Sequence, residues 1–111
     1  MTPTQRTLAK LRKDGWTAAV TEHWNAHAHI RQDLFGFIDI VAFCDSETLA
    51  VQATSYAGVS ARIKKLRALD TVRDWCAGGR RCEIWGWRKG VRGERALRIV
   101  DMAARAAGEG K

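Results

Sequence analysis

The sequence lacks the features that mark a membrane or secreted protein. No apolar run in its 111 residues approaches the roughly 20 residues that a membrane-spanning helix needs. The first residues also lack the apolar core of a secretory signal. The three cysteines are odd in number and have no C-x-x-C spacing, so we interpret them as reduced, mostly buried thiols: Cys44, Cys76 and Cys82. These absences predict a cytoplasmic protein without a membrane partner.

Acidic residues are also scarce. The chain has 12 aspartates and glutamates against 19 lysines and arginines, which gives a net charge of +7. Such an excess favours a polyanionic partner, because each phosphate that a cation neutralises releases a condensed counterion. We therefore expect DNA as the partner, and a generally soluble basic domain is the alternative.

The composition is otherwise that of an ordinary folded protein. Hydrophobic residues make up 46% of the chain and charged residues 28%, and no internal repeat or linker divides the sequence. A chain of this length predicts one domain with a single core. We expect the core to span residues 4–101, and residues 102–111 to form a frayed tail or a short helix.

Hydrophobic periodicity predicts the order of the elements. The expected elements are a basic amphipathic helix over 4–13, a strand over 16–24, a loop over 25–32, an antiparallel hairpin of strands 37–43 and 48–54, a helix over 59–76, a strand over 82–88, and a strand over 95–101 that pairs back on it. The fold class is therefore α/β (α+β), with a mixed sheet flanked by helices in the order α-β-β-β-α-β(-β).

One carboxylate lies in an unusual place. Asp39 stands among apolar residues of a predicted strand, where an unpaired carboxylate would be costly to bury. A metal ion would explain it, and an exposed strand beginning after Gly36 is the alternative. On the next strand Gln52 and Thr54 share one face, which the hairpin can bring against Asp39. Hydrolysis of a phosphodiester with a divalent ion needs oxygen ligands and a positive group, and this layout lacks the positive group.

These segments resemble a known group of nucleases. G-F-I-D-I-V-A at residues 36–42 and L-A-V-Q-A-T at residues 49–54 are similar to the PD-(D/E)XK nuclease superfamily, particularly its small Holliday-junction-resolvase-like and VRR-type members. The resemblance extends over residues 7–90. It implies a restriction-endonuclease-like fold, whose α-β-β-β-α-β core agrees with the expected element order. It also implies cleavage of DNA with Mg²⁺ or Mn²⁺.

The resemblance assigns roles to individual residues. Asp39 would be the main metal ligand, and Gln52 would stand in place of the second acid as a weaker, neutral ligand. Glu22 resembles the acid that many members carry on their first core element. Thr54 occupies the position of the catalytic lysine, where a hydroxyl can orient water but supplies no positive charge.

Either a cation from the helix expected over residues 59–76 supplies the missing charge, or catalysis has been lost and binding retained. Arg62, Lys64 or Lys65 could reach back to the site, but consecutive helical residues differ by about 100°, so at most one of the two lysines faces it. We assign Lys64 to the catalytic set and treat Arg62 and Lys65 as contacts to nucleic acid. A solvated helix face is the alternative for each of them.

Two further groups have open interpretations. Asp33 completes a D-x-x-G-x-x-D spacing with Asp39 and could hold a second metal ion or orient a water; a salt bridge to Arg31 or a turn before Gly36 is equally compatible with its position. His23, His27 and His29 form H-x3-H-x-H in the expected loop. A zinc site needs more ligands in a rigid frame, so we prefer contact with a phosphate or an acid role for one of them.

Aromatic and basic residues meet near the C-terminal end. We expect Trp16, Trp24 and Trp75 in the core. Trp85 and Trp87 share one face of a strand, where they can stack bases or, as is more common on a sheet, pack under a helix. The glycine-rich loop that follows supplies further candidate contacts to nucleic acid: Arg88, Lys89, Arg92 and Arg95.

The leading hypothesis is a metal-dependent DNA endonuclease that acts in recombination, repair or the processing of phage or mobile-element DNA. The resemblance favours a structured or branched substrate, and a homodimer. One alternative is a catalytically inactive nucleic-acid-binding module on the same fold, since Gln52 and Thr54 depart from the superfamily pattern. The other is a basic domain that binds an acidic protein.

Overall fold

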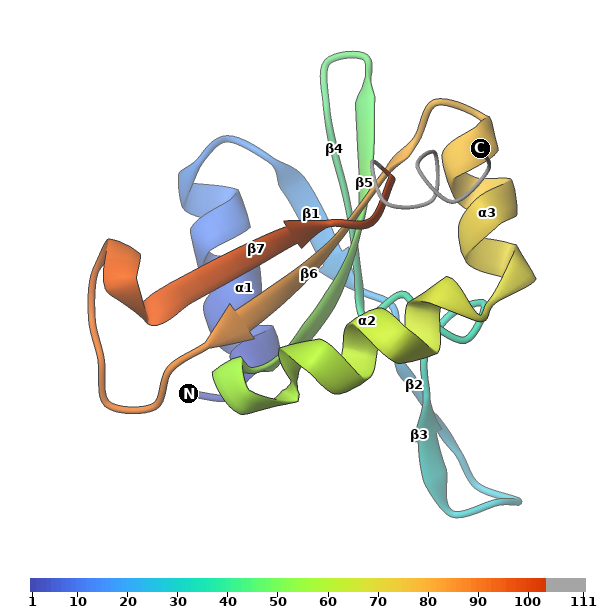
Figure 1. Cartoon of the computed structure of the whole chain (residues 1–111), viewed down its shortest axis with the longest axis horizontal. Coiled ribbons are helices and arrows are strands. Elements are labelled where there is room, and N and C mark those ends of the chain that lie inside the picture. The colour runs from blue at the N-terminus through green and yellow to red at the C-terminus, as the bar shows by residue number, and fades with distance from the viewer. Residues whose placement is uncertain (104–111) are drawn as a thin grey trace.

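The computed structural model describes residues 1–103 and has a five-stranded sheet with helices on both faces (Figure 1). The elements are α1 (Pro3–Lys13), β1 (Thr17–Val20), β2 (His23–Asn25), β3 (Ile30–Gln32), β4 (Ile40–Cys44), β5 (Glu47–Ser55), η1 (Tyr56–Gly58), α2 (Val59–Arg67), α3 (Asp70–Ala77), β6 (Arg81–Trp87), η2 (Glu94–Ala96) and β7 (Leu97–Asp101). The expected fold class, a mixed sheet flanked by helices, is confirmed. The expectation of a frayed tail concerns mainly residues 104–111, which lie outside the described residues.

The sheet has the strand order β1-β4-β5-β6-β7. Strands β5 and β6 are parallel, because the helices α2 and α3 carry the chain back between them, and the other neighbours are antiparallel. The expected hairpin of β4 and β5 is present, and β7 pairs back on β6 as expected.

Alternation along β5 divides the core into two layers. Leu49 and Val51 pack on the side of α1, together with Trp85 and Trp87 of β6. Ala50 packs on the side of α2 and α3. The Trp87 indole also donates a 2.8 Å hydrogen bond to the Thr7 hydroxyl of α1. Trp85 and Trp87 are therefore packed under a helix, which is the more common of the two arrangements expected for them.

The helix expected over residues 59–76 is two helices. Leu69 has an extended backbone (φ −95°, ψ 123°), so α2 ends just before it and α3 begins just after it. The apolar spacing continues across this break, because Leu66, Leu69 and Val72 all pack against the same core cluster. Periodicity alone consequently does not reveal the interruption.

Helix α2 lies unusually close to the sheet at Gly86 of β6. A Cβ at this position would collide with the side chain of Val59 and would lie 3.4 Å from the Cα of Tyr56. Glycine is therefore required for the approach of α2 to the strand, which fixes the height of the helix above the candidate site.

The segment expected as a loop over residues 25–32 belongs to a second, two-stranded sheet. Strands β2 and β3 pair antiparallel, with Trp24 opposite Arg31, and form a hairpin that projects from the main sheet (Figure 1). The side-chain oxygen of Asn25 accepts hydrogen bonds from the backbone of His27 and Ala28 and so closes the turn. The predicted loop is confirmed only for the turn at residues 26–29, because residue 25 and residues 30–32 are strands. The expected burial of Trp24 is wrong, since this residue is 56% exposed.

The three cysteines are free thiols, of which Cys82 is buried and Cys44 and Cys76 are partly buried. Within residues 1–103, no helix combines the length and the apolar character needed to cross a membrane.

Candidate functional site

The candidate site begins at the junction of β4 and β5. The register that pairs Ile40 with Val51 places Asp39 opposite Gln52, so both side chains lie on the α2 face of the sheet. The Asp39 carboxylate accepts hydrogen bonds from the Ala53 backbone at 2.8 Å and from the Gln52 amide at 3.0 Å. Asp39 is only 5% exposed, so the alternative of an exposed strand beginning is wrong.

The projecting hairpin supplies two more carboxylates. His23 pairs with Gln32 at the end of the hairpin farthest from its turn. The residues directly beyond this pair, Glu22 and Asp33, therefore face each other across the base of the hairpin. Carboxylate oxygens of Glu22, Asp33 and Asp39 lie within 4.8 Å of one another. Glu22 follows β1 in a connecting segment and is not within the strand expected over 16–24. The antiparallel pairing of β2 and β3 thus assembles the acidic cluster.

Asp33 forms the turn before Gly36 that its position in the sequence allowed, and its ion pair is with a different cation from the one expected. Its backbone carbonyl accepts a hydrogen bond from Gly36, which forms the turn after the hairpin. Its side chain turns toward the acidic cluster and forms an ion pair with Lys65, at 3.5 Å, rather than with Arg31.

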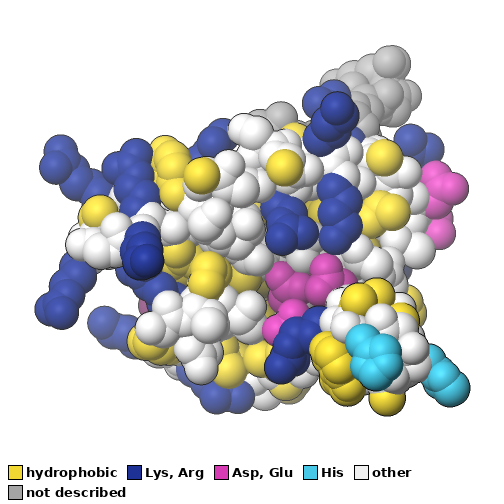
Figure 2. Space-filling model, turned by 90° about the horizontal axis from the view of Figure 1, so that it is seen from below, with side chains coloured by type: hydrophobic (Ala, Val, Ile, Leu, Met, Phe, Trp, Pro, Cys, Tyr) yellow, Lys and Arg dark blue, Asp and Glu magenta, His cyan; other side chains and the backbone are white. Residues whose placement is uncertain are grey.

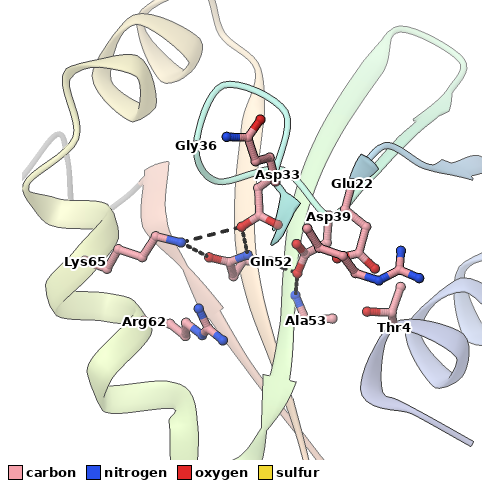
Figure 3. Close-up of a pocket in the computed structure, with 11 residues that line it drawn as sticks. Thr4, Glu22, Asp33, Gly36, Asp39, Gln52, Ala53, Arg62 and Lys65 are labelled. Carbon is pink, nitrogen blue, oxygen red and sulfur yellow. Dashed lines mark hydrogen bonds and ion pairs between the residues drawn. The ribbon is translucent and has the colours of Figure 1, made fainter. Parts of the chain in front are cut away.

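The lysine that faces the site is Lys65 and not Lys64. The Lys65 ammonium is 3.5 Å from Asp33 and 3.4 Å from the Gln52 carbonyl oxygen, and Figure 3 shows it reaching from α2 toward both. Arg62, one helical turn earlier, lines the same pocket. Lys64 points about 100° away from Lys65 around the helix axis, and it lines a separate surface hollow with Ile63. The assignment of Lys64 to the catalytic set is therefore wrong.

Gln52 links the acids to the lysine. Its amide nitrogen donates a 3.0 Å hydrogen bond to Asp33 and another to Asp39, while its oxygen accepts from Lys65. The oxygen expected to bind a metal ion thus faces the lysine. In this arrangement Gln52 orients two carboxylates and one ammonium group at once.

Thr54 lies outside the pocket. It is buried, and its hydroxyl lies against Gly58 at the start of α2, where a Cβ would collide with it. Thr54, which the resemblance aligns with a catalytic lysine, thus packs between β5 and α2.

The pocket has a volume of about 600 Å³ and opens between α2, the hairpin and the N-terminus of α1 (Figure 3). The sequence interpretation missed three residues that line it: Thr4, Arg31 and Gln32. A hairpin over residues 23–32 would have indicated Arg31 and Gln32. Nothing in the sequence pattern indicates Thr4.

Burial shapes the proton equilibria of the two aspartates. Burial raises the pKa of Asp39 to about 7, and a hydrogen bond shared with Asp33 adds to the rise, although Gln52 and Ala53 oppose it. Burial also raises the pKa of Asp33, but hydrogen bonds with Asp39 and Gln52 and the charge of Lys65 outweigh it, so the net shift is downward. Between the lowered pKa of Asp33 and about pH 7, the pair of aspartates therefore holds one proton.

The loop after β6 carries the expected basic residues Arg88, Lys89, Arg92 and Arg95, all of them exposed. Arg6 of α1 holds this loop by donating to the backbone carbonyls of Arg88 and Val91 at 2.9 and 3.0 Å. The guanidinium of Arg88 lies over the ring of Tyr56, 4.2 Å from its centre.

The loop and the acidic pocket lie at the same edge of the molecule. Strand β5 contributes Ala53 to the acidic pocket and Ser55 to a second pocket lined by Lys89 and Arg92. In Figure 2 the acidic side chains lie between lysines and arginines on one side and the histidine-bearing hairpin on the other. The basic loop, the acids and the hairpin therefore form one continuous surface.

The three histidines are exposed on the hairpin, and within the described part of the chain Glu22, Asp33 and Asp39 form the group suited to a metal ion. Neither a protein-family model nor a curated protein matches the chain. The function consequently has to be argued from the site itself.

Proposed function

We propose that the protein is a metal-dependent nuclease that hydrolyses phosphodiester bonds in DNA. The observation that carries the proposal is the convergence of three carboxylates within 4.8 Å, with the Lys65 ammonium 3.5 Å from one of them. Oxygen ligands for a cation and a separate positive charge are the two requirements of this chemistry. Membership of the PD-(D/E)XK superfamily is part of the same proposal, supported by the element order and the place of Asp39 on the sheet.

The residues present fit Mg²⁺ or Mn²⁺. Mg²⁺ takes oxygen ligands at about 2.0–2.1 Å, so neighbouring ligand atoms lie roughly 3 Å apart, and a cluster within 4.8 Å needs only small side-chain rotations. Gln52 binds one oxygen of Asp33 and one of Asp39, which leaves the second oxygen of each for the ion. Glu22 would complete the set. The bound ion would polarise the phosphate and lower the pKa of a coordinated water.

Side chains around the pocket would do the remaining work. Lys65 and Arg62 project from one face of α2 into the pocket and would neutralise charge on the phosphate. Lys65 thereby takes the role that the superfamily gives to a lysine at the position of Thr54. The net charge of +7 and the exposed loop with Lys89 and Arg92 would attract the DNA backbone.

A specific observation favours a second candidate, a catalytically inactive DNA-binding module. The Gln52 amide donates to both Asp33 and Asp39, so these carboxylates have hydrogen-bond partners without any ion. A glutamate at this position would instead require a cation to relieve repulsion between like charges.

A cleavage assay separates the two candidates. Plasmid, single-stranded and branched DNA would be incubated with Mg²⁺, Mn²⁺, Ca²⁺ or EDTA, and binding would be measured in parallel by gel shift. We expect products only with Mg²⁺ or Mn²⁺. Asp39→Asn and Lys65→Ala should each reduce the cleavage rate by about 100-fold or more while binding is kept.

Lys64→Ala is the matched control, because Lys64 is on the same helix but lines another hollow. It should retain the wild-type cleavage rate. Wild-type protein that binds DNA yet yields no product in any metal would overturn the nuclease and support the binding module.

A further inference from the structure

One face of the β2–β3 hairpin lies directly beyond the acidic cluster. The pairing of Trp24 with Arg31 puts these two side chains on one face of the hairpin, and Glu22 and Asp33 stand immediately before β2 and immediately after β3. Glu22, Asp33 and Arg31 line the pocket. Trp24 lies further out on the Arg31 face, about 7 Å from Glu22 along an extended chain.

The ring of Trp24 is unusually open for its type. The residue is 56% exposed, and its ring makes an edge contact with His29, at 6.4 Å between ring centres. An exposed tryptophan on a projecting arm beside a cation offers an aromatic face and a positive charge together, which suits a stacked base and its phosphate. Trp24 contributes nothing to the two core clusters, and its exposure therefore has no explanation in the stability of the fold.

We propose that this hairpin face binds an unpaired nucleotide of the DNA, with its base stacked on Trp24 and its phosphate bound by Arg31, next to the bond cut in the acidic pocket. The inference rests on the proposed function, because it names the form of DNA that the site takes. Inside a duplex both faces of a base are covered by its neighbours, so an aromatic ring can stack on a base that has left the duplex or that ends it. The step from Glu22 to Trp24 is a length that one extended nucleotide can span.

Charge favours nucleic acid over a second copy of the chain as the occupant. The Trp24 face carries Arg31 and adjoins Lys65 and Arg62, which together suit a phosphate. The other exposed large hydrophobic residue of the hairpin, Ile30, pairs with Asn25 and so lies on the opposite face. Trp24 and Ile30 thus form no shared apolar patch of the kind that the core of a dimer interface needs.

Binding measured in EDTA tests the inference independently of cleavage. The probes are a single-stranded oligothymidine and a fully paired duplex of equal length, each with a fluorescent label for anisotropy. Trp24→Ala should weaken binding of the single strand by about tenfold, the loss of one stacked base, and leave binding of the duplex unchanged. Trp24→Phe should recover most of the affinity because it keeps an aromatic face.

Ile30→Ala on the opposite face is the matched control and should bind both probes like the wild type. Melting temperatures would confirm that all variants are folded, as expected for exposed positions. Equal affinity of wild type and Trp24→Ala for the single strand would overturn the proposal. So would a dimer, seen by sedimentation, that Trp24→Ala dissociates without any change in DNA binding.

The two proposals fail in different ways. If the wild type cuts no DNA but its binding of the single strand depends on Trp24, the nuclease is overturned and the nucleotide platform stands. If cleavage needs Asp39 while Trp24→Ala changes neither binding nor rate, the platform is overturned and the nuclease stands.

Discussion

Gln52 is the residue on which the organisation of the candidate site depends most. Its amide spans two aspartates on one side and a lysine on the other, with all contacts at 3.0 to 3.4 Å. A neutral side chain here lets Asp33 and Asp39 lie together without a third like charge. Gln52 therefore stabilises the acidic cluster when no ion is bound.

Asp39 gives the folded protein a pH dependence of defined sign. Its pKa is about 7 in the fold against an ordinary value of 3.8, so between these values the folded protein holds a proton that the unfolded chain has lost. Stability should fall as pH rises through this range, by at most about 1.4 kcal/mol per pH unit. The pKa of Asp33 is lowered in the fold, so the ionised form of Asp33 stabilises the folded protein. This stabilisation is lost on acidification, at pH values below the range in which Asp39 has its effect.

Asp39→Asn should remove this dependence, because an amide resembles the protonated carboxyl. We expect denaturant unfolding in EDTA to show a stability that declines from about pH 5 to pH 7 in the wild type and stays nearly level in the variant. Asp45→Asn, at an exposed turn, is the control and should follow the wild type. A parallel decline in Asp39→Asn would contradict the assignment.

At the scale of elements, helix α2 decides which cation reaches the pocket. The rotation of α2 about its own axis points Arg62 and Lys65 into the acidic pocket and Lys64 away from it. The distance of α2 from the sheet depends on Gly86. A shift of this helix would move the cations relative to carboxylates that are held by other elements. Packing far from the acids is therefore coupled to the geometry of the site.

Gly86→Ala tests that coupling. The added methyl would collide with Val59, so we expect a loss of stability of about 1–3 kcal/mol and a displaced α2. If the protein is a nuclease, the cleavage rate should fall more than binding of Mn²⁺, since Lys65 moves while the acids stay. Gly79→Ala separates this effect from a general response to loss of glycine, because no atom lies within 4 Å of that position, although its positive φ adds strain. Unchanged stability in Gly86→Ala would show that the helix has room to adapt.

At the scale of the whole molecule, charge is distributed unevenly along one edge. The acidic pocket lies between the basic loop after β6 and the projecting hairpin, as Figure 2 shows. A polyanion that lies along this edge would be bound by the cations of the loop. The acidic side chains would repel its phosphates unless a metal ion were bound between them. Attraction and chemistry would thus depend on separate groups.

Salt dependence of DNA binding checks this separation. The double variant Lys89→Ala and Arg92→Ala should bind DNA more weakly and reduce the slope of log affinity against log salt by about two, one for each lost phosphate contact. Its binding of Mn²⁺ should equal that of the wild type. Arg73→Ala, on the exposed side of α3, serves as the control. If the salt dependence of DNA binding were the same in the double variant and the wild type, the DNA would not contact Lys89 and Arg92.

The sequence predicts the main sheet and Asp39 well, because long strands such as β5 show a clear two-residue alternation. It does not reveal β2 and β3, which are three residues each and are joined by a turn of histidine and alanine without glycine or proline. The choice between Lys64 and Lys65 depends on the phase of α2, which periodicity does not fix to within one residue. The sequence therefore names all three acids as candidate ligands, but the convergence of Glu22 and Asp33 on Asp39, and the choice of lysine, depend on tertiary structure.

The hairpin that brings Glu22 against Asp33 has a thermodynamic consequence. A two-stranded ribbon of this length is marginally stable alone, so its opening would take the ligand set apart. An ion that binds only the assembled set would stabilise the closed ribbon by mass action. Amide hydrogens of residues 23–32 should then exchange with solvent more slowly as Mn²⁺ is added. The metal ion would in that case stabilise the folded hairpin in addition to its role in hydrolysis.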